Sequence, residues 1–179
     1  MKKLGIIGGT SWNSTALYYD HINREVARRL GGLSSAKLVL ENIDLAPYAA
    51  LQQAGETGEA EKIIVAAGEN LKAAGAEAIL IASNTTNRYA PAVRAATELP
   101  LLDISKPTID RMLKDGRKSI ALLGTRFVMT EDFGRRPYED AGLDISPITP
   151  DWVATVDRIV FDELAMGIVR RDSQRALKS

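Results

Sequence analysis

Short apolar runs alternate with amphipathic segments along this chain, and that alternation limits the folds available to it more than any other feature. The runs, which are too short to be helices, span residues 4–7, 37–40, 78–82, 101–104, 119–123 and 144–148. Strands that alternate with helices form parallel sheets, because each connecting helix returns the chain to the edge of the sheet where the next strand starts. We therefore predict a doubly wound α/β chain whose parallel sheets are flanked by helices.

The amphipathic segments are the predicted helices. The most regular of them spans residues 60–74, where apolar side chains recur on one face and Gly75 ends the helix. Thr130 is expected to cap a helix over residues 130–142. A further helix is expected over residues 151–166, with Val153, Val156, Val160 and Leu164 facing inward. The remaining helices are expected from the turn at residues 8–11 to Leu30, over residues 87–98 and 105–116, and from residue 172 onward. The segment around Asp44 and Pro47 is expected to be a loop.

Composition excludes several kinds of chemistry. Basic and acidic side chains balance at 23 each, which leaves no electrostatic argument for nucleic acid or an acidic membrane surface as a partner. The 179 residues include no cysteine, and the single histidine, His21, is too few for most zinc sites. No apolar run approaches the roughly 18 residues of a membrane span, and the run at residues 4–7 is too short for a signal peptide. We therefore expect a cytoplasmic protein.

Polar turns follow three of the predicted strands, at Gly8-Gly9-Thr10, Ser83-Asn84-Thr85 and Gly124-Thr125. In an open parallel sheet, ligands bind beyond the carboxyl ends of the strands, where these turns are expected to lie. The paired glycines allow close backbone approach, and N–H groups in such a turn can point at an anion. The Asn84 amide and the Thr85 hydroxyl can hold a carboxylate, but Ser, Thr and Asn are equally the preferred residues for capping a helix.

Two nucleotide-related interpretations have less support. The glycines at positions 5, 8 and 9 lack the G-x-G-x-x-G spacing of a dinucleotide-binding loop. Residues 6–10 are similar to the phosphate loop of purine nucleoside phosphorylases, but the rest of the chain does not follow that family.

Several segments together resemble the aspartate/glutamate racemase family: residues 4–15, 18–19, 21–23 and 124–127, with Met129. The resemblance implies two similar α/β lobes, over residues 1–99 and 100–179, the second of which stops before its last strand and helix. It also implies an amino-acid racemase that needs no metal, no pyridoxal phosphate and no other cofactor. Members of the family remove the α-proton of the substrate with one cysteine and return a proton from a second, and each lobe supplies one of the two.

The chain departs from the family pattern at both cysteines. The family's third strand ends in Cys-(Thr)-Asn-Thr, and aligning this motif with residues 82–85 places Ala82 at the first thiol position. The second thiol lies in a Gly-Cys-Thr-Glu turn, which the 179 residues do not contain. The hydroxyls of Ser83 and Thr85 are far less acidic than a thiol, whose reference pKa is about 8.5. Asn87 stands where relatives often have histidine, and His21, inside the first helix, fits a packed or capping histidine better than a catalyst.

We interpret the sequence as a member of this racemase family that is inactive as written. The alternative is a relative without catalytic activity that binds a small carboxylate. In both, the ligand is a small carboxylate or an acidic amino acid, and Arg126 or Lys106 are candidates to meet its side chain. An unpaired edge in the second sheet and the resemblance both favour a homodimer. The residues expected to bind the substrate are Gly9, Thr10, Ser83, Asn84, Thr85 and Thr125.

Overall fold

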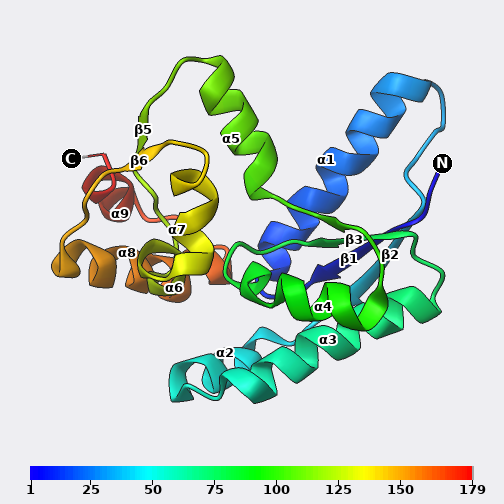
Figure 1. The fold of residues 1–179 in the computed structure, drawn as a ribbon, viewed down its shortest axis with the longest axis horizontal. Helices are drawn as coiled ribbons and strands as arrows, with labels where there is room; N and C mark the ends of the chain where they lie inside the picture. The colour runs from blue at the N-terminus through cyan, green and yellow to red at the C-terminus, as the bar shows by residue number, and fades with distance from the viewer. Residues whose placement is uncertain (179) are drawn as a thin grey trace. The chain divides into compact units, whose positions relative to one another are not determined.

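The computed structural model describes residues 1–178, which form two compact units (Figure 1). The first unit is Met1–Leu102 and the second begins at Asp103. The division lies three residues beyond the boundary expected after residue 99, because strand β4 (Leu101–Leu102) pairs with β3 (Ala78–Ile81) and so belongs to the first sheet.

The first unit is built on a four-stranded parallel sheet, as the sequence predicted. The sheet contains β1 (Leu4–Gly8) and β2 (Leu38–Asn42) besides β3 and β4, in the order β2-β1-β3-β4. The register pairs Ile7 with Ile81 and Gly8 with Asn42, so the turns after β1, β2 and β3 begin at the same edge of the sheet. The predicted class of an α/β chain with parallel sheets flanked by helices is confirmed.

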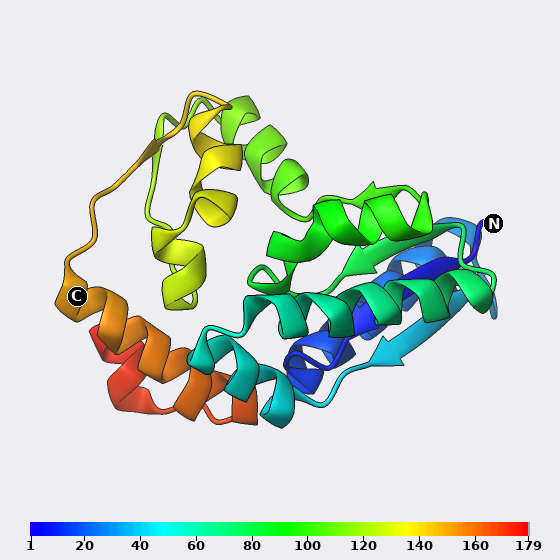
Figure 2. The same cartoon turned by 60° about the horizontal axis from the view of Figure 1, so that its bottom comes forward.

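Helices cover both faces of this sheet (Figure 2). Helix α1 lies on one face, and α3 and α4 lie side by side on the other. Gly75 ends α3 as predicted: at φ +81° its N–H donates to the Lys72 carbonyl at 2.9 Å, and the Ala76 N–H donates to the Leu71 carbonyl at 3.0 Å. The helices of this unit are α1 (Trp12–Leu30), α2 (Leu45–Ala54), α3 (Thr57–Ala73), the 3₁₀ turn η1 (Thr86–Tyr89) and α4 (Ala90–Thr97).

The segment around Asp44 and Pro47 is helix α2, and the loop predicted there is wrong. The Asp44 carboxylate accepts a hydrogen bond from the Ala46 N–H at 3.1 Å and caps the helix. Pro47 stands in the first turn. An N–H in that turn would have no acceptor within the helix, so proline, which lacks one, is tolerated there. The two residues that suggested a loop are therefore the start of a helix.

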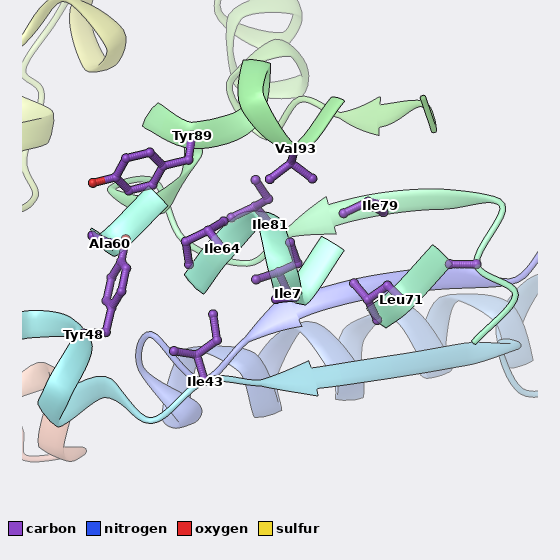
Figure 3. Close-up of a cluster of buried hydrophobic side chains, with 12 residues drawn as sticks. Ile7, Ile43, Tyr48, Ala60, Ile64, Leu71, Ile79, Ile81, Tyr89 and Val93 are labelled. Carbon is purple, nitrogen blue, oxygen red and sulfur yellow. The ribbon is translucent and has the colours of Figure 1, made fainter. Parts of the chain in front are cut away.

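The core of the first unit lies between the sheet and α3 (Figure 3). In Figure 3, Ile7 and Ile81 of neighbouring strands lie beside Ile64 of α3. The face predicted for this helix is buried at Ala60, Ile64, Ala67 and Leu71, but Ala74 is exposed because α3 ends one residue before it. The buried cluster consists of Ile7, Ile43, Tyr48, Ala60, Ile64, Ala67, Leu71, Ala76, Ile79, Ile81, Tyr89 and Val93.

The second unit contains a smaller parallel pair of strands, β5 (Ser119–Ile120) and β6 (Asp144–Ile145). Both are shorter than the predicted runs at 119–123 and 144–148, and Ile120 packs with Tyr138 and Leu143 in a small core. The expected homodimer stays a prediction. The helices here are α5 (Ser105–Lys114), α6 (Arg126–Thr130), α7 (Asp132–Glu139), α8 (Pro150–Asp162), η2 (Leu164–Met166) and α9 (Arg171–Ala176).

Two helix predictions in the second unit are wrong. Thr130 does not cap a helix over residues 130–142: it is the last residue of α6, and its hydroxyl donates back to the Arg126 carbonyl at 2.8 Å. Extended backbone at Glu131 (φ −97°, ψ 153°) separates α6 from α7. Leu164 is 44% exposed because α8 ends before it; Val156 is buried as predicted, together with Ile159. None of the helices that residues 1–178 form is long and apolar enough to cross a lipid bilayer.

A substitution at Gly9 tests the close approach of the first two turns. Gly9 has φ +85°, and a Cβ there would overlap the backbone of Ile43. We expect Gly9→Ala to lower the free energy of unfolding by about 2–4 kcal/mol, measured by chemical denaturation. Gly58→Ala is the matched control, because a Cβ at Gly58 meets nothing within 4 Å. Equal stability of the two variants would contradict the close contact.

Candidate functional site

The turn after β1 is held by a threonine of the following helix. The Gly9 N–H donates to Thr15 Oγ1 at 3.0 Å, and the Thr15 hydroxyl donates to the Ser11 carbonyl at 3.1 Å. Ser11 caps α1 with an unusual positive φ of 135°, and its hydroxyl oxygen accepts from the Ser14 N–H at 3.4 Å. Thr10, between these two anchored residues, is half-buried at the carboxyl edge of the sheet.

The turn after β3 is equally well ordered. The Asn87 amide donates to the carbonyls of Ile81 and Ser83, at 3.1 and 2.6 Å, and so closes the turn on itself. The Ser83 hydroxyl oxygen accepts from the Thr86 N–H at 3.3 Å. Asn87, which stands where relatives often carry histidine, therefore holds the backbone of this turn together.

Ala82 and Ser83 occupy different environments. Ala82 directly follows β3, its N–H donates to the Ile7 carbonyl of β1 at 2.9 Å, and it is only 2% exposed. Ser83 is the first residue after β3 that is partly exposed. A side chain at position 82 is therefore almost fully buried, whereas a side chain at position 83 is partly exposed to solvent.

Three buried or half-buried hydroxyls connect the turns. The Tyr48 hydroxyl donates to Thr86 Oγ1 at 3.4 Å, and the Thr86 hydroxyl donates to Thr10 Oγ1 at 3.3 Å. Gln52, one turn further along α2, donates to the Tyr48 oxygen at 3.3 Å. Burial raises the pKa of Tyr48 to about 12, so the phenol stays protonated at any ordinary pH.

Tyr48, Gln52 and Thr86 are residues of this edge that the sequence did not predict. The signal that could have found the first two is their spacing of four residues, which places them on one face of a helix. The loop predicted for this segment hides that spacing. Thr86 directly follows the polar turn at residues 83–85, and nothing in the sequence shows that it is fully buried.

Donors without partners remain at the same edge of the sheet. Asn84 is exposed, and its side-chain amide has no hydrogen-bond partner among residues 1–178. Over the same residues, the backbone N–H groups of Thr10 and Asn84 also lack an acceptor. Uncharged donors in neighbouring turns can bind an anion without needing a lysine or arginine.

The other predicted residues lie elsewhere. Thr125, in the second unit, caps α6 and accepts from the Val128 N–H at 3.5 Å. The Arg126 guanidinium lies 4.6 Å from the centre of the Phe127 ring, and Lys106 is paired with Asp110 at 3.0 Å on α5. His21 is exposed on α1, so the packed or capping role expected for it is not observed. Across residues 1–178, no three His, Asp or Glu side chains gather as a metal site would require.

The fold and these turns define a parallel α/β protein with a donor-rich edge on its first sheet. The sequence pattern of the Asp/Glu/Hydantoin racemase family matches residues 7–179, so the chain belongs to that family. The resemblance inferred from the motifs is confirmed.

Solved structures agree with this assignment. A candidate Asp/Glu racemase from Yersinia pestis is 39% identical, with a TM-score of 0.87, and the match covers 99% of this chain and 77% of that one. An aspartate racemase homologue from Pyrococcus horikoshii is 32% identical, with a TM-score of 0.74 and coverage of 94% and 74%. The aspartate racemase of Picrophilus torridus, at 18% identity, TM-score 0.75 and coverage of 99% and 72%, shares the fold.

Proposed function

We propose that the first unit binds a small carboxylate, of the acidic amino-acid class, at the turns that follow β1 and β3. The contact between the Thr86 and Thr10 hydroxyls, at 3.3 Å, carries this proposal because it joins the two turns at one edge. Thr10 and Asn84 supply N–H groups, a hydroxyl and an amide to the carboxylate. Gly9, which has no side chain, lets the backbone come close to the carboxylate. Ser83 and Thr85 are the remaining residues proposed to contact it.

The family supports the choice of ligand. The relatives from Pyrococcus horikoshii and Picrophilus torridus are described as an aspartate racemase homologue and an aspartate racemase. Racemisation inverts the α-carbon: one group removes the α-proton and another delivers a proton to the opposite face. N–H groups at the carboxylate would also stabilise the enolate-like charge that develops during this reaction.

We propose further that the 179-residue chain binds without racemising. It contains no cysteine, and a serine or threonine hydroxyl is a far weaker acid than a thiol with a pKa of about 8.5. The only histidine, His21, lies on α1, where it is exposed and far in sequence from the turn after β3. The chain therefore combines an anion-binding edge with no group suited to move the α-proton near pH 7.

Within the turn after β3, we propose that position 83, not position 82, faces the ligand. Aligning the family's cysteine with Ala82 places a thiol at a point that is only 2% exposed. Ser83 carries its hydroxyl on the partly exposed side of the turn, next to Asn84. A base at position 83 would have access to a bound α-carbon, whereas one at position 82 would be separated from it by the backbone.

Calorimetry tests the binding proposal. We expect aspartate, glutamate or malate to bind with a Kd of about 1 mM, since the site offers neutral donors only. Thr10→Val and Asn84→Ala should each weaken binding roughly threefold to tenfold, because each removes one donor. Thr108→Val, at an exposed position of α5, is the control and should leave the affinity unchanged. If none of these acids gives heat at concentrations on the order of 10 mM, about tenfold above the expected Kd, the proposal is refuted.

Proton exchange tests the absence of catalysis. In deuterated water we expect no loss of the α-proton signal of aspartate or glutamate beyond the rate without protein, because no thiol is present. The measurement is proton nuclear magnetic resonance at several protein concentrations. Exchange that rises in proportion to protein would show that another residue acts as the base.

Single-thiol variants distinguish positions 82 and 83, because the wild-type chain has no cysteine to interfere. We expect the thiol of Ser83→Cys to react with a chromogenic disulfide reagent at least about tenfold faster than that of Ala82→Cys, which is buried. Ser35→Cys, at an exposed loop position, gives the reference rate. Malate should slow the reaction at position 83 and not at position 35. Faster reaction at position 82 than at 83 would reverse the assignment.

A further inference from the structure

A chain of polar side chains runs from helix α2 to the turn after β1. It begins at Gln52, passes through Tyr48 and Thr86, and ends at Thr10, with distances of 3.3, 3.4 and 3.3 Å between successive polar atoms. Gln52, Tyr48 and Thr86 are 5%, 1% and 0% exposed, and Thr10 is half-buried. The chain therefore starts inside the first unit and ends at the proposed carboxylate site.

The side-chain N–H of Gln52 can only donate, so its contact with the Tyr48 oxygen sets the direction of the hydrogen bonds that follow. Gln52 donates to Tyr48, Tyr48 donates to Thr86, and Thr86 donates to Thr10. A hydroxyl has one hydrogen, so each of the first two hydroxyls uses its hydrogen on the next member. Thr10 accepts from Thr86 and keeps its own hydrogen, which has no acceptor among residues 1–178. The last member of the chain is thus left as a donor at the edge of the sheet.

We propose that Tyr48 is a positioning residue, which acts through Thr86 to hold the Thr10 hydroxyl as a donor toward a bound carboxylate. This inference rests on the proposed carboxylate site. Without the Tyr48 hydrogen, the Thr86 oxygen is left without that donor and can accept the hydrogen of the Thr10 hydroxyl, which lies 3.3 Å away. Reversal of that last bond would turn the lone pairs of Thr10, and not its hydrogen, toward the anion.

The environment of the chain supports a fixed direction. Burial keeps the Tyr48 phenol protonated, so it remains a donor over the whole ordinary pH range. Thr86 is fully buried, so water cannot replace either of its partners. Hydrogen bonds in series also polarise one another, which strengthens the final donor.

The test compares affinities for malate by calorimetry. Tyr48→Phe removes one oxygen from the chain, and we expect it to weaken malate binding roughly threefold to tenfold. Tyr19→Phe, at a position 55% exposed on α1, is the matched control and should bind as the wild type does. Thr86→Val should weaken binding to a similar extent, and Thr86→Ser, which keeps the hydroxyl, should restore it.

A double variant separates positioning from a general loss of structure. If Tyr48 acts only through the Thr10 hydroxyl, Tyr48→Phe combined with Thr10→Val should bind no more weakly than Thr10→Val alone. Additive losses in the double variant, or wild-type affinity in Tyr48→Phe, would overturn the inference while the carboxylate site stands. If the wild type itself gives no heat with malate, the proposed function fails and this inference fails with it. Chemical denaturation of each variant checks that the first unit is folded, and if Tyr48→Phe is not, the pair Thr86→Val and Thr86→Ser decides.

Discussion

The close approach of two backbones, at Gly9 and Ile43, is the contact on which the donor-rich edge depends. The Ile43 N–H donates to the Gly8 carbonyl at 3.0 Å, and the positive φ of Gly9 then turns the chain toward α1. Any side chain at position 9 would overlap the Ile43 backbone. Helix α2 starts at Leu45, two residues beyond this contact. The contact between Gly9 and Ile43 therefore also determines where Tyr48 of α2 enters the core.

Much of the fold could be predicted from periodicity, and the failures have a common cause. The strands of the first sheet and helix α3 were found because their apolar residues repeat over several turns or strand positions. Helix α2 was missed because Asp44 and Pro47 are as common in turns as in the first turn of a helix. The break between α6 and α7 was not predicted either. It depends on the extended backbone of Glu131, and no residue type in that segment indicates such a conformation.

The candidate site could be placed by sequence but not completed by it. A strand followed by a polar turn was enough to indicate Gly9, Thr10, Ser83 and Asn84, because the carboxyl ends of parallel strands meet at one edge. The same information could not separate position 82 from position 83, as a motif alignment carries no measure of burial. It could not supply Tyr48 and Thr86 either, because their contribution is a contact between residues 38 positions apart.

Binding and proton transfer make different demands on this edge. An anion site made of backbone N–H groups and hydroxyls depends on the conformation of the turns, which Gly9, Asn87 and Thr15 hold through backbone geometry and hydrogen bonds. Proton transfer at the α-carbon depends instead on one or two side chains of suitable pKa, and replacing a thiol by a hydroxyl or a methyl group removes that property. Such a replacement leaves the turn, its N–H groups and its neighbours in place. A chain of this family can therefore lack a group for proton transfer after β3 while the hydrogen-bond donors of the turns after β1 and β3 stay in place.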